Sequence, residues 1–125
     1  MKPIETGNLN SKVLENPEKR NWFLGHFMDP SSLFHSTDVE IKWGIHKKGE
    51  KYENAKANPQ AKSLAILVSG NEKFYFPDTD ETIILQKEGD YVIWNSGVFH
   101  SCEMIEDTTI ITIRWPSVPN NTLSK

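Results

Sequence analysis

The residue with the clearest chemical potential is His100, which follows a turn between two short segments. Tyr91–Trp94 is rich in strand-forming residues, and Asn95-Ser96-Gly97 has the composition of a tight turn. The imidazole therefore lies at the end of a sheet, where barrels commonly open to ligands. Because histidine changes protonation near neutral pH, it can act as an acid/base or a metal ligand. We predict that His100 is catalytic; a structural histidine that ties the turn to the next strand is the alternative.

Five further side chains are candidates for ligand binding. Cys102 lies two residues after His100 and so on the same face of the strand, although it could be only a small buried hydrophobe. The Arg114 guanidinium favours a carboxylate or phosphate, or else lies on a solvated exterior face. The aromatic candidates could line a pocket for a flat or sugar-like ligand, or form a packed core. The predicted ligand-binding residues are Trp43, Tyr75, Trp94, Cys102 and Arg114.

His46 is the candidate for a second metal ligand. Residues 39–46 alternate between an apolar set and a polar set, which predicts a strand with one wet face. If the apolar face points into the barrel, His46 points outward with Glu40 and Lys42; a bulge at Gly44 would reverse this. A metal held by His100 and His46 would still need a carboxylate, and the nearby candidates are equally well explained as solvated loop charges. These are Glu50, Glu53 and Asp90.

Short strands separated by turn residues must position these side chains. No long helix is expected, and about eight strands at near-regular spacing indicate an antiparallel barrel or sandwich. The predicted strands are residues 22–27, 39–46, 64–68, 73–76, 82–85, 90–94, 98–105 and 108–115. Residues 47–62 are predicted to form a long loop because they are charged and contain Pro59. The expected organisation is a polar arm over 1–20, one barrel domain over 21–119 and a polar tail over 120–125.

The segment around His100 resembles the second motif of the cupin superfamily. Gly89, Gly97 and His100 fall at the family's spacing, with Asn95 in the place of its proline. The first motif is present only as Gly70 and the strand pattern, since Ser63 stands in the place of the family's glutamate. Its two histidines are also replaced, by Ala57 and Pro59 or by Lys56 and Asn58. The resemblance implies an all-β, antiparallel cupin-like barrel of the jelly-roll type that lacks the usual metal triad.

Three functions are compatible with this resemblance. The first is a small-molecule-binding cupin without a cofactor, and in its enzymatic form an isomerase, epimerase or lyase with His100 as acid/base. The second is a metal-dependent, oxygenase-like cupin with a divalent transition metal at His100 and His46. The third is a non-catalytic module that binds an effector or assembles with partners. Because cupins typically pair, a homodimer that shares the apolar 22–27 strand is also expected.

Composition limits the remaining possibilities. The chain has 125 residues, which is enough for one core, and its net charge of −3 and pI near 5.8 give no reason to expect nucleic acid or an anionic membrane as a partner. Its single cysteine excludes an internal disulfide. No apolar run is long enough to span a bilayer, so we expect a soluble, cytoplasmic protein that binds a small molecule of unknown identity.

Overall fold

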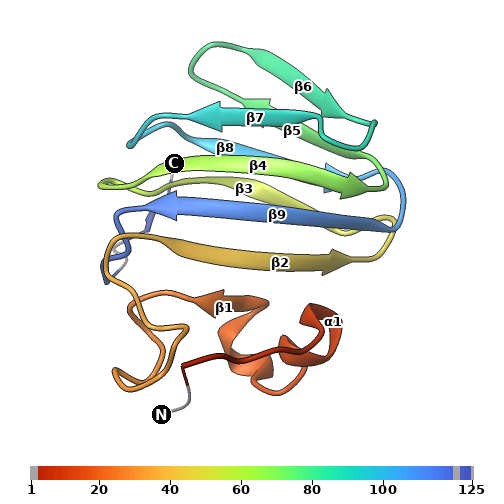
Figure 1. The fold of residues 1–125 in the computed structure, drawn as a ribbon. Helices are drawn as coiled ribbons and strands as arrows, with labels where there is room; N and C mark the ends of the chain where they lie inside the picture. The colour runs from red at the N-terminus through yellow and green to blue at the C-terminus, as the bar shows by residue number, and fades with distance from the viewer. Residues whose placement is uncertain (1–2, 120–121, 125) are drawn as a thin grey trace.

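The computed structural model describes residues 3–119 and 122–124, which form two antiparallel five-stranded sheets (Figure 1). The first sheet contains, in spatial order, β1 (Trp22–Leu24), β2 (Glu40–His46), β9 (Thr108–Trp115), β4 (Lys62–Ser69) and β7 (Tyr91–Trp94). The second contains, in spatial order, β10 (Leu123–Ser124), β3 (Lys51–Ala57), β8 (His100–Met104), β5 (Glu72–Phe76) and β6 (Glu81–Leu85). This arrangement confirms the predicted all-β jelly-roll barrel.

An apolar core fills the half of the barrel between β4, β7, β5 and β6. Its members alternate along their strands, since every second side chain of a strand points to the same face. The fully buried set is Ala65, Leu67, Phe74, Phe76, Leu85 and Ile110, against which Trp94 and Cys102 pack partly buried. Burial of this apolar area is the main stabilising contribution in the fold.

The sequence prediction is wrong for residues 47–62, where β3 forms in the predicted loop. Its residues are mostly exposed, and lysine, asparagine and alanine are poor strand formers. The strand exists because its backbone pairs with β8 on one side and with the two-residue β10 on the other. A strand near a sheet edge is held by these backbone bonds and can form without apolar alternation, so the sequence carries no pattern by which to recognise it. Residues 120–121 and 125 of the predicted tail lie outside the described residues.

The N-terminal segment lies against the outside of β2. It contains α1 (Leu9–Lys12) and the 3-10 helix η1 (Pro17–Lys19), and Figure 1 shows α1 and β1 beside β2. Val13 is only 4% exposed, and Asn10 accepts a hydrogen bond of 2.7 Å from the Trp43 indole. The strand β1 pairs with β2 of its own chain. No helix of the described part of the chain is long and apolar enough to cross a membrane.

The orientation predicted for β2 is therefore wrong, because its apolar face is the outer one. The N-terminal segment covers Trp43 from outside, whereas Glu40 on the opposite face is 5% exposed. No bulge is needed, since β2 and β9 stay in regular register from Glu40↔Arg114 to His46↔Thr108. The alternation was correct, but an apolar face can be buried on either side of a sheet.

Candidate functional site

The polar face of β2 places three charged or titratable side chains inside the barrel. Lys42 and His46 lie on the face of Glu40, and the His46 side chain is 10% exposed. They meet polar residues that β5, β8 and β9 present from the facing positions. The half of the barrel that lacks the apolar core is thus lined by charged groups.

His46 belongs to one end of this polar half. Its Nδ1 lies 2.7 Å from Glu50 Oε2, and its ring packs edge-on against Tyr52 at 6.1 Å between centroids. Gly44 makes room for the ring, because a Cβ there would lie 2.8 Å from His46 Nε2. Burial lowers the pKa of His46, while the hydrogen bond that its ring donates to Glu50 acts in the opposite direction.

His100 lies inside the barrel, in an aromatic environment. Its ring is 4.6 Å from that of Trp94 and 6.3–6.5 Å from those of Phe76 and Phe74. Burial, with a further contribution from the Arg114 charge, lowers the pKa of His100 to about 4. The imidazole is therefore neutral at pH 7. Its buried Nδ1 has no hydrogen-bond partner among the described residues.

Glu72 is a functional candidate that the sequence reasoning missed. It is 3% exposed at the start of β5, on the inward face that it shares with Phe74 and Phe76. Burial raises the pKa of Glu72 to about 7, although the Cys102 hydrogen bond and the Lys42 charge both lower it. Its Oε1 has no partner among the described residues. The sequence does carry a signal for its burial, because Glu72 occupies the same alternate positions of β5 as Phe74 and Phe76.

Cys102 separates the two unpartnered groups along the inner face of β8 and β5. Its register partner is Phe74, and Glu72 is paired one step further on, with Met104. Burial and the Glu72 carboxyl raise the pKa of the Cys102 thiol far above its ordinary value. A thiol that stays protonated is a poor nucleophile, so a structural and hydrogen-bonding role fits Cys102 best.

Lys42 lies between the two ends of the polar half. Its charge acts on Glu72, Cys102 and His46, and also on His100 and Arg114. Burial, followed by the Arg114 charge, lowers the pKa of Lys42. Among the described residues no carboxylate oxygen lies within 4.0 Å of its Nζ. The ammonium group is thus near many polar groups and paired with none.

Arg114 anchors the other end, beside His100. Its Nη1 lies 3.4 Å from Glu40 Oε2, and the second carboxylate oxygen of Glu40 accepts a 2.9 Å hydrogen bond from Ser117. The Trp22 ring covers the guanidinium, with 4.5 Å between Arg114 Cζ and the ring centroid. Glu40 therefore holds Arg114 in the barrel by a single close contact, and most of the guanidinium N–H donors have no side-chain partner among the described residues.

Two predicted ligand-binding residues do not reach this interior. Trp43 is on the outer face of β2, and Tyr75 is 36% exposed on the outer face of β5, where it bonds to Asp80. Both predictions assumed an inward orientation, which the structure corrects. Trp94, Cys102 and Arg114 do face the interior together with His100.

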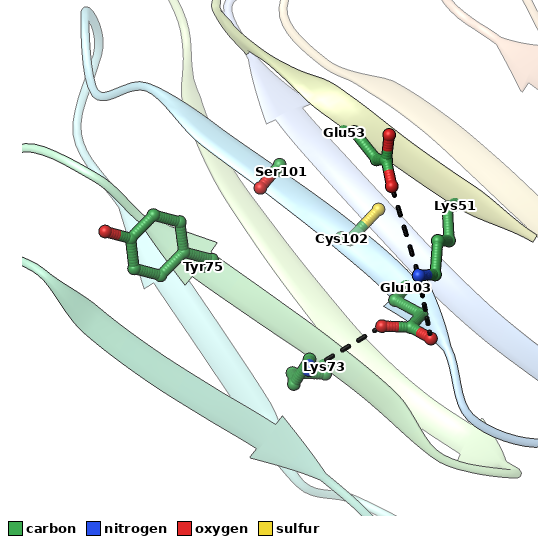
Figure 2. Close-up of a pocket in the computed structure, with 7 residues that line it drawn as sticks. All are labelled: Lys51, Glu53, Lys73, Tyr75, Ser101, Cys102 and Glu103. Carbon is green, nitrogen blue, oxygen red and sulfur yellow. Dashed lines mark ion pairs between the residues drawn. The ribbon is translucent and has the colours of Figure 1, made fainter.

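A shallow depression of about 260 Å³ lies on the outside of the second sheet (Figure 2). Figure 2 shows Glu103 between Lys51 and Lys73, with an ion pair to each. The N···O distances are 3.8 Å to Lys51 and 3.6 Å to Lys73. Glu53 also lies 3.9 Å from Lys51, so two lysines and two carboxylates neutralise one another here. Ion pairs on the surface contribute little to stability, and these leave no net charge to attract a ligand. We therefore place the candidate site in the barrel interior and not in this depression.

The residues present do not fit the metal centre of the alternative, metal-dependent cupin. Within residues 3–119 and 122–124, no three or more His, Cys, Asp and Glu side chains are grouped so that they could hold a metal ion. His46 and His100 both face inward, but His46 is engaged by Glu50 and His100 is enclosed by aromatic rings. Among the described residues, His46 and His100 are therefore not joined by the further ligands that a metal site needs.

Comparisons with known proteins reveal the fold. No protein-family model and no curated protein matches the chain. Among solved structures, a Klebsiella pneumoniae protein with a double-stranded β-helix domain has a TM-score of 0.67 at 12% identity, over 98% of this chain and 92% of its own. KdgF from Halomonas has a TM-score of 0.59 at 16% identity, over 67% and 74%. Pac13 from Streptomyces, a nucleoside dehydratase, has a TM-score of 0.60 at 11% identity, over 72% and 70%.

Proposed function

From a cupin fold with a polar interior, we propose that this chain binds a small molecule inside the barrel and that Glu72 moves a proton there without a metal ion. The observation that carries the proposal is the Glu72 carboxyl, which is buried, has one oxygen without a partner in the described part of the chain and has a pKa of about 7. An acid/base group is most effective when its pKa lies near the working pH. Glu72 can therefore both accept and release a proton at neutral pH.

His100 has a different role in this proposal. With its pKa lowered to about 4, it is neither protonated at pH 7 nor a strong base. A neutral imidazole can still donate or accept a hydrogen bond through its unpartnered Nδ1. We therefore propose that His100 orients the ligand. The proton transfer that the sequence analysis expects of His100 is assigned to Glu72.

The reaction class that this arrangement supports is proton transfer in an elimination or isomerisation. In an isomerisation one protein group takes a proton from one carbon and returns it to another. In an elimination it takes a proton from carbon and can pass it to the group that leaves from the neighbouring carbon. The dehydratase Pac13, which has a similar fold, catalyses a reaction of this general kind. Fold similarity alone does not fix chemistry, so the support for the proposal comes from Glu72.

The test is a thermal-shift screen of small metabolites, followed by turnover assays of those that stabilise the protein. We expect the Glu72→Gln variant to keep ligand binding and to lose at least about 100-fold in kcat, the contribution typical of an acid/base group. Glu81→Gln, which changes an exposed carboxyl on β6, is the matched control and should keep full activity. Full activity of Glu72→Gln, or a screen in which no compound stabilises the protein, would contradict the proposal.

A further inference from the structure

We propose that Lys42, Arg114 and Trp22 form a binding subsite for the carboxylate group of the ligand. This inference rests on the proposed function, because it names the chemical class that the interior site accepts. Lys42 lies on β2 and Arg114 on β9, and both project from the inner face of the first sheet. The Trp22 ring lies over the two cations, 5.5 Å from Lys42 Nζ and 4.5 Å from Arg114 Cζ.

The register explains why the two cations are neighbours. Lys42 pairs with Thr112, and Arg114 pairs with Glu40, so the two cations are diagonal neighbours on antiparallel strands. Diagonal side chains on one face are within reach of each other when they are long. Trp22 pairs with Lys42 from the other side of β2 and brings its ring to the same face. Three adjacent strands thus bring two cations and one aromatic ring together.

The two cations lack the negative charge that would balance them. Glu40 contacts Arg114 through one pair of atoms, and no carboxylate of the described residues lies within 4.0 Å of Lys42 Nζ. Like charges placed side by side destabilise a fold unless an anion lies between them. The proximity of Arg114 lowers the pKa of Lys42 in the same way, after burial. A bound anion would relieve this repulsion.

The charge balance favours a carboxylate over a phosphate. With the Glu72 carboxyl protonated, two cations and the Glu40 carboxylate leave about one positive charge, which a monoanion neutralises. A dianionic phosphate would leave an excess of negative charge in a half-buried place. Arg114 can also offer two parallel N–H donors to a carboxylate. Glu72 and His100 lie along the same interior, where they would contact the uncharged part of the ligand.

The probe for the test is sodium butyrate, with butyramide as its uncharged analogue and inorganic phosphate as the competing anion. All titrations are run at one ionic strength, and the four tryptophan indole N–H signals are followed by NMR. The Trp22→Phe variant assigns the Trp22 signal. We expect butyrate to shift this signal saturably, and butyramide to leave it in place.

Two lysine variants distinguish binding from a structural role. Lys42→Met keeps most of the aliphatic side chain without the charge, and it should weaken butyrate binding at least tenfold. Lys42→Arg should restore most of the binding. Lys73→Met, which changes an exposed lysine on the outside of β5, is the matched control and should behave as the wild type. A lysine with only a structural role would change stability without changing the preference for butyrate over butyramide.

Several outcomes would overturn the subsite. These are a butyrate response that survives in Lys42→Met, an equal response to butyramide, and saturable binding of phosphate with no response to butyrate. If uncharged compounds bind in the barrel but butyrate does not, the carboxylate subsite is wrong while small-molecule binding stands. If nothing binds in the interior, both proposals fail together.

Discussion

Replacing Glu72 by glutamine should make the protein more stable at high pH than the wild type. Burial raises the pKa of Glu72 from 4.5 to about 7, so the folded protein holds this proton more tightly than the unfolded chain does. Its stabilising contribution is complete below pH 4.5 and is lost as the pH rises to about 7. At about 1.4 kcal/mol per pKa unit, the loss amounts to about 3 kcal/mol. Glutamine has nearly the same shape and does not ionise.

The assay is urea unfolding of the wild type and Glu72→Gln at several pH values between 4 and 8. The free energy of unfolding of the variant minus that of the wild type should increase by about 3 kcal/mol between pH 4.5 and 7.5. Glu81→Gln, at an exposed position, should show no such increase. A constant difference would refute the reasoning. A difference that decreases with pH would show that Lys42 stabilises the Glu72 carboxylate more than burial destabilises it.

Two further predictions concern other residues that face the barrel interior. Gly44→Ala places a Cβ 2.8 Å from His46 Nε2 and 3.1 Å from Ile110 Cγ2, so it should lower the free energy of unfolding by about 1–3 kcal/mol; an unchanged urea midpoint would contradict this. Cys102, whose raised pKa follows from burial, should react with a disulfide reagent at pH 8 at least about tenfold more slowly in the native protein than in urea. Equal rates in the two states would show an accessible thiolate.

The sequence predicts the barrel well because strands and turns are local features. The turn before His100 fixes that residue at the start of β8, and the two-residue spacing carries Cys102 to the same inner face. The alternation of β2 is also visible in the sequence. The sequence does not show which face of β2 points inward, because that depends on the N-terminal segment that covers Trp43 from outside. The inward position of His46 follows from this distant contact.

The centre of the candidate site was predicted less well than its edge. Glu72 and Lys42 were overlooked because charged residues on strands usually face water. Glu72 shares its face with Phe74 and Phe76, so its burial could have been inferred from spacing alone. The pairing of Lys42 with Trp22 could not have been inferred from the sequence, because it depends on the register between β1 and β2. Strand β3 was missed for a similar reason, because only its pairing identifies it.

Glu72 and His100 should have opposite effects on the pH dependence of stability, which the wild type conceals. The pKa of His100 is lowered from 6.5 to about 4, so its contribution is complete above pH 6.5 and is lost as the pH falls to about 4. The contribution of Glu72 is lost in the opposite direction, as the pH rises from 4.5 to about 7. Between about pH 4.5 and 6.5 the two slopes are of similar size and cancel.

Single variants should therefore change the slope of the wild type in opposite directions. In Glu72→Gln, stability should rise with pH relative to the wild type, because the contribution of His100 is no longer offset. In His100→Gln it should fall relative to the wild type, and the double variant should follow the wild type, because His46, whose pKa is also lowered, is present in all four proteins. Urea unfolding of all four proteins at pH 4.5, 5.5 and 6.5 measures these slopes. In each single variant, the free energy of unfolding relative to the wild type should change by about 2–3 kcal/mol between pH 4.5 and 6.5. If both single variants keep the slope of the wild type, the two groups do not titrate as buried residues and the interior is more hydrated than this structure indicates.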